Sequence, residues 1–161
     1  MNRYNGRPAL HAFGVKGAPT KEPESEAETA LLLQAMISSE HPGIDFVIGD
    51  YNTSAGVDLL VEKLDKGIRT EKWAELVSSL ENLFAWEHPP LGIHIVVCYT
   101  LGRVKEHQKF TDGTEARLVT KTPGRYALIV GEETIDVYVL REILEQASRR
   151  EADDTRLART V

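Results

Sequence analysis

Several carboxylates of this sequence lie in or beside apolar runs, where a charge is destabilising unless it is solvated, paired or bound to a metal ion. Asp58 interrupts an apolar, strand-like run, GVDLLV, and Asp50 occupies a core-facing position at the end of the preceding run. Glu75 follows in WAELV, and Glu28 projects from a helix-forming segment. Because a buried charge without a partner is strongly destabilising, Asp58 must be solvated, paired or coordinating.

Two interpretations of these carboxylates are open. Hard cations such as Mg²⁺ take oxygen ligands from one or two carboxylates together with substrate phosphate. Asp58 and Glu75 on neighbouring strands would therefore make a metal site. Alternatively, Glu75 is a solvent-facing helical residue and Asp58 is a charge on an edge strand. The residue pattern by itself favours this second, structural interpretation.

Other motifs that carry chemistry are absent from the sequence. We find no P-loop, GxGxxG, GxSxG or HExxH pattern, and the five histidines lack the spacing of metal ligands. His94 lies in an apolar strand, where we expect a histidine whose hydrogen bonds are satisfied. Cys98 is the only cysteine, and its apolar surroundings predict a buried structural thiol.

The elements that would position the carboxylates follow from local patterns in the first half of the chain. The run ETALLLQAMISSE predicts a helix ended by His41-Pro42-Gly43, with Ser25 as its cap and Glu28 at the capping-box spacing. The runs IDFVIGDYN and VDLLVEK predict two strands of a hairpin.

The segment over 70–86, TEKWAELVSSLENLFAW, has two interpretations. Its apolar residues recur at helical spacing, which favours a helix throughout. Trp73, Glu75 and Val77 also fit one face of a short strand, with a helix that begins near Ser78. The first alternative is the one that periodicity favours.

The second half of the chain predicts further strands and a closing helix. IHIVVCYT is typical of a strand that is buried on both faces. EARLVTKT and RYALIVG predict two strands, and the segment from Thr134 begins as a strand and becomes a helix near Leu140. We therefore expect an α/β (α+β) fold with a mixed sheet flanked by helices.

Length and charge limit the number of domains and the classes of partner. The 161 residues carry 19 Lys and Arg against 25 Asp and Glu, a net charge of −6, so the chain is not globally basic. We expect a flexible arm or linker over 1–25, one domain over 26–148 and a charged tail over 149–161. No signal peptide or membrane-spanning run is evident, which predicts a soluble, cytoplasmic protein without membrane partners.

The order of these features resembles the PD-(D/E)XK, or restriction-endonuclease-like, nuclease superfamily. A helix that carries Glu28 precedes a hairpin that carries GVDLLVE with Asp58. The segment ELV with Glu75 follows, and then the buried strand IVVCY. The resemblance covers about residues 26–100. It makes WAEL a strand with a helix that starts near Ser78, so the expected element order, with the elements predicted above, becomes α-β-β-β-α-β-β-β-α.

The resemblance also implies roles for individual residues. Asp58 and Glu75 would take the places of the acidic metal ligands, and Glu28, with Glu26 as substitute, that of the helix glutamate; the catalytic set would be Asp58, Glu75 and Glu28. The sequence departs from the family two residues after Glu75, where the lysine is replaced by Val77. Valine cannot stabilise an attacking water or a charged phosphate electrostatically.

Two functions follow from this departure. The first is a nuclease-like module that is catalytically degenerate and acts in protein or nucleic-acid interaction or assembly, in defence or repair. The second is an active Mg²⁺-dependent endonuclease that cuts phosphodiester bonds, with Asp58 and Glu75 as metal ligands. DNA, RNA, a protein partner and self-association as a homodimer are the partners that these functions imply. Whether the protein is an enzyme is left open.

Overall fold

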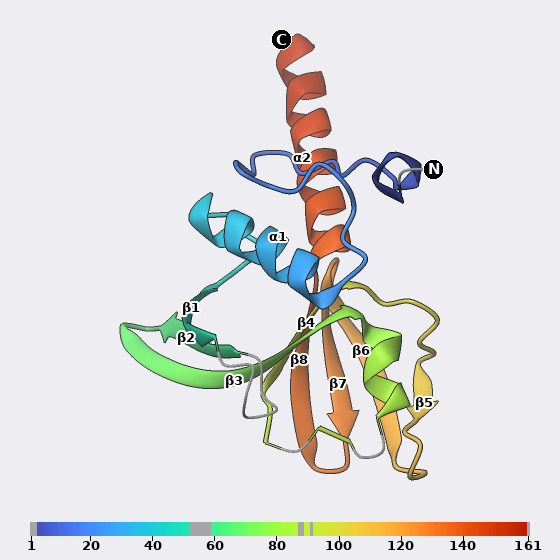
Figure 1. Ribbon diagram of the computed structural model, residues 1–161. Helices are drawn as coiled ribbons and strands as arrows, with labels where there is room; N and C mark the ends of the chain where they lie inside the picture. Colours follow the sequence, from blue (N-terminus) through green and yellow to red (C-terminus); the bar gives the residue numbers. More distant parts are fainter. Residues whose placement is uncertain (1–2, 52–58, 87–88, 91, 161) are drawn as a thin grey trace.

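The computed structural model describes residues 3–51, 59–86, 89–90 and 92–160 of the chain. Its strands form one sheet in the order β1-β2-β3-β4-β8-β7-β6-β5, with helices packed against it (Figure 1). The strands are β1 (Phe46–Tyr51), β2 (Leu59–Asp65), β3 (Ile68–Ser79), β4 (Ile95–Thr100), β5 (His107–Lys109), β6 (Glu115–Thr122), β7 (Arg125–Val130) and β8 (Glu133–Val139). The helices are η1 (Arg3–Gly6), α1 (Glu26–Ser38), η2 (Leu80–Ala85) and α2 (Leu140–Arg159).

The sheet is mixed, as the sequence predicts. Strands β1, β2 and β3 pair antiparallel, β3, β4 and β8 pair parallel, and the pairs from β8 to β5 are antiparallel. An α+β fold with a mixed sheet is therefore confirmed. The detailed order differs from the expected one, because β3 is followed by a short 3-10 helix and then by five strands. The expected order has three strands there. It omits β5, whose three residues are too few for a periodic signal, and it does not count separately the strand expected from Thr134, which is β8.

The prediction of a helix over 70–86, which periodicity favours, is wrong. Residues through Ser79 form the long strand β3, and only Leu80–Ala85 are helical, as a 3-10 helix. The inner part of β3 pairs with β2 on one side and with β4 on the other, and both of its faces are covered. Apolar residues on both faces blur the two-residue period of a strand, which is why the spacing resembled that of a helix.

Two apolar cores lie on opposite faces of the sheet. On one face, Ala74, Leu76 and Val97 pack with residues of α1 and the start of α2. On the other face, Val77, Val96 and Cys98 pack with η2 and Phe110. Cys98 is fully buried, as expected, and burial raises the pKa of its thiol.

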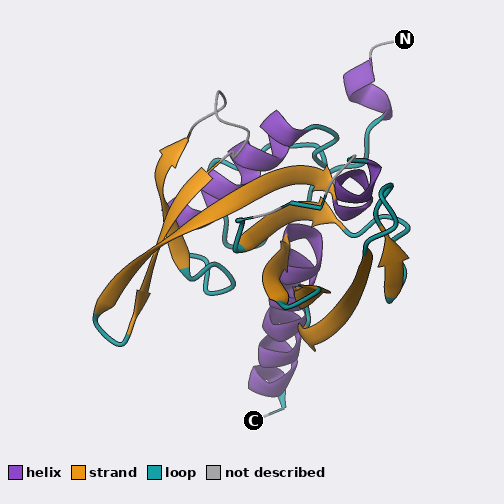
Figure 2. Cartoon of the chain, turned by 90° about the horizontal axis from the view of Figure 1, so that it is seen from below, coloured by secondary structure: helices purple, strands orange, loops and turns teal. Residues whose placement is uncertain are grey.

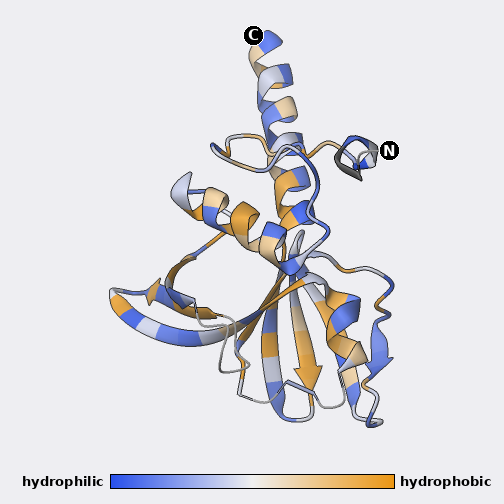
Figure 3. Ribbon diagram, in the orientation of Figure 1, coloured by the Kyte–Doolittle hydropathy of each residue, from blue (hydrophilic) through white to orange (hydrophobic). Residues whose placement is uncertain are grey.

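The two α-helices begin where the sequence places them. Ser25 caps α1 by accepting a hydrogen bond from the Glu28 amide, as predicted. Strand β8 continues directly into α2 at Leu140, and the buried residues Leu140, Ile143 and Leu144 all lie in its first turns. The rest of α2, including residues 149–159 of the predicted tail, is mainly hydrophilic and extends beyond the sheet (Figure 3).

The β2–β3 hairpin projects from the domain, whereas the N-terminal segment packs against it. The hairpin of β2 and β3 continues past the first pair of β1 with β2, Phe46 with Lys63, and projects from the domain (Figure 2). In the predicted arm, Leu10 and Ala12 pack against the first core. None of the described helices is both long enough and apolar enough to cross a membrane.

Candidate functional site

The structure places Glu75 on the inner part of β3. It is 4% exposed and is the one carboxylate that is buried among the described residues. It lies between Ala74 and Leu76, which face α1, so its side chain points to the opposite face, the face of Val77. The structural interpretation of Glu75 as a solvent-facing helical residue is therefore wrong, and the strand implied by the resemblance is observed.

The strand face that carries Glu75 is occupied by apolar residues near position 77, where the resemblance implies a lysine. Val77 is 6% exposed and belongs to the core with Leu80 and Val96. The lysines of the hairpin strands, Lys63 and Lys72, share the α1 face with Val61 and Ala74. Among the described residues of β2 and β3, the face of Glu75 thus carries no lysine.

Asp58 lies outside the described residues, so its metal-binding role remains a prediction. Its chain neighbour Leu59 pairs with Ala74, the neighbour of Glu75. Asp50, expected at a core-facing position, is exposed. The register shifts between Ile48 and Asp50, and such a bulge turns the residue that follows it away from the face that the alternation predicts.

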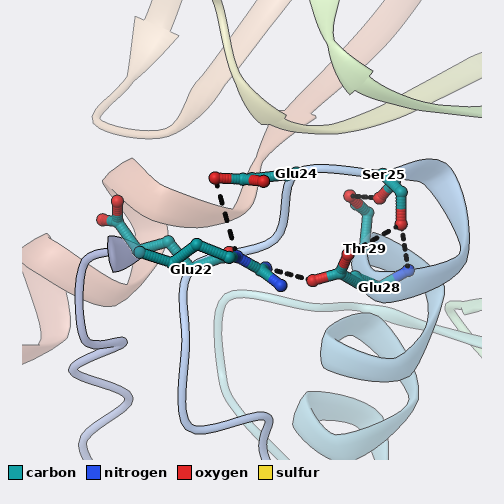
Figure 4. Close-up of polar contacts among 6 residues, drawn as sticks. Glu22, Glu24, Ser25, Glu28 and Thr29 are labelled. Carbon is teal, nitrogen blue, oxygen red and sulfur yellow. Dashed lines mark hydrogen bonds and ion pairs between the residues drawn. The ribbon is translucent and has the colours of Figure 1, made fainter. Parts of the chain in front are cut away.

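Glu28 lies at the start of α1 in a polar cluster with the N-terminal segment (Figure 4). Arg7 forms an ion pair and hydrogen bond with Glu28, and its Nε lies 3.6 Å from Glu24 Oε1. Ser25 Oγ also donates to Glu28 Oε1 at 3.1 Å. These contacts connect the predicted arm to the helix through charge, a link that local sequence signals do not contain.

Glu28 and Glu75 are not brought together. Helix α1 packs on the face of Ala74 and Leu76, whereas Glu75 points to the other face. The substitute Glu26 is an exposed residue of the same first helical turn. Of the three predicted catalytic residues, the structure therefore separates Glu28 from Glu75 by the thickness of the sheet.

The hydrogen bond from Arg7 holds the pKa of the Glu28 carboxyl below its usual range, although burial opposes this effect. A lowered folded-state pKa means that the pair stabilises the fold above the unfolded pKa, about 4.3 for glutamate. That contribution is lost as the pH falls through the folded-state pKa.

We therefore expect Arg7→Ala to lower the free energy of unfolding by about 1 kcal/mol near neutral pH and by less in acid. Urea unfolding of both proteins at neutral pH and near pH ~3 measures the difference. Arg117→Ala is the control, because Arg117 is exposed and forms no ion pair with another described residue. An equal loss at both pH values would contradict the role of the Glu28 charge.

The described residues hold no group of three or more His, Cys, Asp or Glu side chains placed to bind a metal ion. Comparison with models of protein families finds no match to this chain, and comparisons with curated proteins and with solved structures also find none. The function is therefore inferred from the fold and the side-chain geometry.

Proposed function

We propose that the chain is a divergent PD-(D/E)XK-like module whose cutting site is incomplete, and that it acts by binding and assembly. The element order supports this proposal: helix α1, the β1–β2 hairpin, strand β3 and the buried strand β4 follow one another in the chain. The four strands are also neighbours in the sheet. This is the order of features on which the resemblance rests.

The packing of Val77 is the observation that carries the proposal. In the family pattern this position holds a lysine that acts on the attacking water or the phosphate. Here the side chain belongs to an apolar core, and its strand partner is Cys98, which is fully buried. An ammonium group at this position would need to leave the core to reach a phosphate, so the usual electrostatic assistance is missing.

A second observation supports binding as the activity. Large apolar side chains that are exposed in the described chain gather on the first three strands, where five of them lie: Val47, Tyr51, Leu64, Ile68 and Trp73. Strand β1 is also an edge of the sheet. By strand register, Val47, Leu64 and Trp73 lie on one face of these strands and Tyr51 and Ile68 on the other. Exposed apolar side chains and open strand edges are typical of surfaces that contact another protein, and self-association is the simplest case.

The test measures cutting and assembly on the same preparation. Without and with Mg²⁺ or Mn²⁺, we expect the full chain to leave single- and double-stranded DNA and RNA intact. By sedimentation velocity, we expect self-association that is lost in the double variant Leu64→Ser with Ile68→Ser. Lys66→Ser is the control, because it introduces serine in the turn between β2 and β3 without removing an apolar side chain. Metal-dependent cutting that Asp58→Ala abolishes would overturn the proposal, as would a monomer at all concentrations.

The active Mg²⁺-dependent endonuclease is the second candidate, and the burial of Glu75 is the observation that favours it. A buried carboxylate is retained against a desolvation cost, and such groups concentrate at functional sites. In this case Asp58 and Glu75 would hold the ion, and a lysine from another element or a second ion would replace the missing lysine. Cutting that requires both carboxylates is the result that this candidate predicts.

A further inference from the structure

A cavity of about 470 Å³ lies away from the β2–β3 carboxylates, at the base of α2. Its walls come from the N-terminal segment, the turn after α1, the β6–β7 turn and one side of α2. This volume lies within the range of pockets that hold small molecules. Among the residues that line it are Phe13, His41, Pro123, Arg125, Ala147 and Arg150.

Arg125 is the main polar group of this cavity. Its side chain is 23% exposed, and its guanidinium carbon lies 3.7 Å from the centre of the Tyr138 ring. The nearest anion is Asp45, 3.8 Å from Nη1, which is beyond hydrogen-bond distance. Asp45 already pairs with Lys63 at 3.0 Å and accepts a hydrogen bond from Tyr138. Two cations therefore share one carboxylate, and the positive charge of Arg125 is only partly balanced.

The guanidinium also lacks acceptors. Its Nε is buried without a hydrogen-bond partner, and none of the described residues accepts a hydrogen bond from its other nitrogens. A half-buried guanidinium whose N–H groups lack protein acceptors is a group that a carboxylate satisfies with two parallel hydrogen bonds.

His41 adds a neutral donor to the same cavity. It is 7% exposed, and its Nδ1 accepts a hydrogen bond from the Gly43 amide at 3.0 Å. Desolvation lowers the pKa of His41, which favours the neutral ring. With Nδ1 as acceptor, the proton of the neutral ring lies on Nε2, where it can be donated.

The charged side chains that line the cavity are Arg125 and Arg150 against Glu40, Glu151 and Asp154, an acidic excess that disfavours a ligand with several negative charges. Helix α2 meets the base of the cavity at Ile143, while Glu151 and Asp154 line it about 12 and 16 Å further along the helix axis. These acids repel a polyanion, whereas the partly balanced Arg125 attracts an anionic group. The side chains of Phe13, Pro42 and Pro123 supply apolar contact for the body of the ligand.

We propose that this cavity binds a small monocarboxylic acid with an aromatic or apolar body, with its carboxylate at Arg125. The site is separate from the β2–β3 face, so it does not depend on the nuclease-like function. Benzoate is the probe, benzamide its neutral isostere and citrate the polyanion. Each is titrated into the isotopically labelled full chain at constant ionic strength and followed by backbone amide NMR.

We expect benzoate to saturate with a dissociation constant of about 1 mM or below, with the largest shifts at Gly43, Arg125 and Gln146. Benzamide and citrate should bind at least about tenfold more weakly. Arg125→Gln should weaken benzoate binding by a similar factor, but Arg125 also packs on Tyr138 and its loss can disturb the fold.

A second variant, Ala147→Leu, tests the cavity without removing Arg125. Its larger side chain fills the cavity, and leucine is a good helix former, so the helix is expected to remain intact. We expect this variant to abolish benzoate binding, while Ala152→Leu, on an exposed part of α2 outside the cavity, leaves binding unchanged. The proposal fails if wild type gives no saturable shifts with benzoate. It also fails if benzamide binds equally well, or if the two alanine variants bind alike.

Discussion

We expect Val77→Lys to lower the free energy of unfolding by about 3 kcal/mol and to create no cutting activity. The substitution places a lysine at the position where the proposed resemblance would require one. Val77 is 6% exposed and packs in the core that contains Leu80 and Val96, so an ammonium group there loses its hydration among apolar neighbours. The buried carboxylate of Glu75, two residues earlier on the same face, offsets only part of that loss. Urea unfolding gives the stability, and a DNA-cutting assay with Mg²⁺ gives the activity.

Val47→Lys is the matched control for this prediction. Val47 is also a strand valine, but its side chain is 50% exposed on the edge strand β1. We expect its replacement to change the free energy of unfolding by less than about 0.5 kcal/mol. A Val77→Lys protein that is as stable as wild type and cuts DNA would contradict the burial argument. It would also show that the remaining groups of the site are complete.

The second large effect is expected for Gly124→Ala, in the turn between β6 and β7. Gly124 has φ +84°, and a Cβ atom built there would lie 2.5 Å from Ile143 Cγ1 and 2.9 Å from the Ile143 backbone nitrogen. Because the helix backbone cannot yield to a methyl group, the turn and α2 must separate. We expect a loss of about 3 to 4 kcal/mol in the free energy of unfolding, from backbone strain and overpacking together.

Gly113→Ala separates the two contributions. Gly113 has φ +88°, close to the value at Gly124, but its Cβ would have no neighbour within 4 Å. We expect a cost of about 1 to 2 kcal/mol from the left-handed conformation alone. Thermal or urea unfolding of both variants gives the difference. Equal losses would mean that the close approach of the turn to α2 does not limit stability.

Local sequence signals were sufficient for several elements. The Ser25 cap of α1, the buried strand with Cys98 and the change from strand to helix at Leu140 were predicted and are observed. Each depends on neighbouring residues only: a side chain that reaches an amide three residues on, a continuous apolar run, and a switch of period. These signals act within a few residues, so they can be read without knowing the rest of the fold.

The segment over 70–86 and the carboxylates needed the tertiary structure. Strand β3 has neighbouring strands on both sides and apolar cover on both faces, which its own spacing does not reveal. The same pairing places Glu75 on the face opposite α1 and thereby apart from Glu28, which Arg7 holds from 21 residues away. Sequence patterns show which residues are acidic, whereas the face on which each one lies depends on strand register.

By itself, the sequence determined several local elements and the presence of valine at position 77, because both follow from residue type and near neighbours. Only the tertiary structure decided that Val77 belongs to a core, that Glu28 and Glu75 lie on opposite faces, and that Arg125 borders a cavity. The physical reason is that burial and electrostatic pairing arise between segments far apart in the chain, whose approach depends on how the whole sheet is assembled.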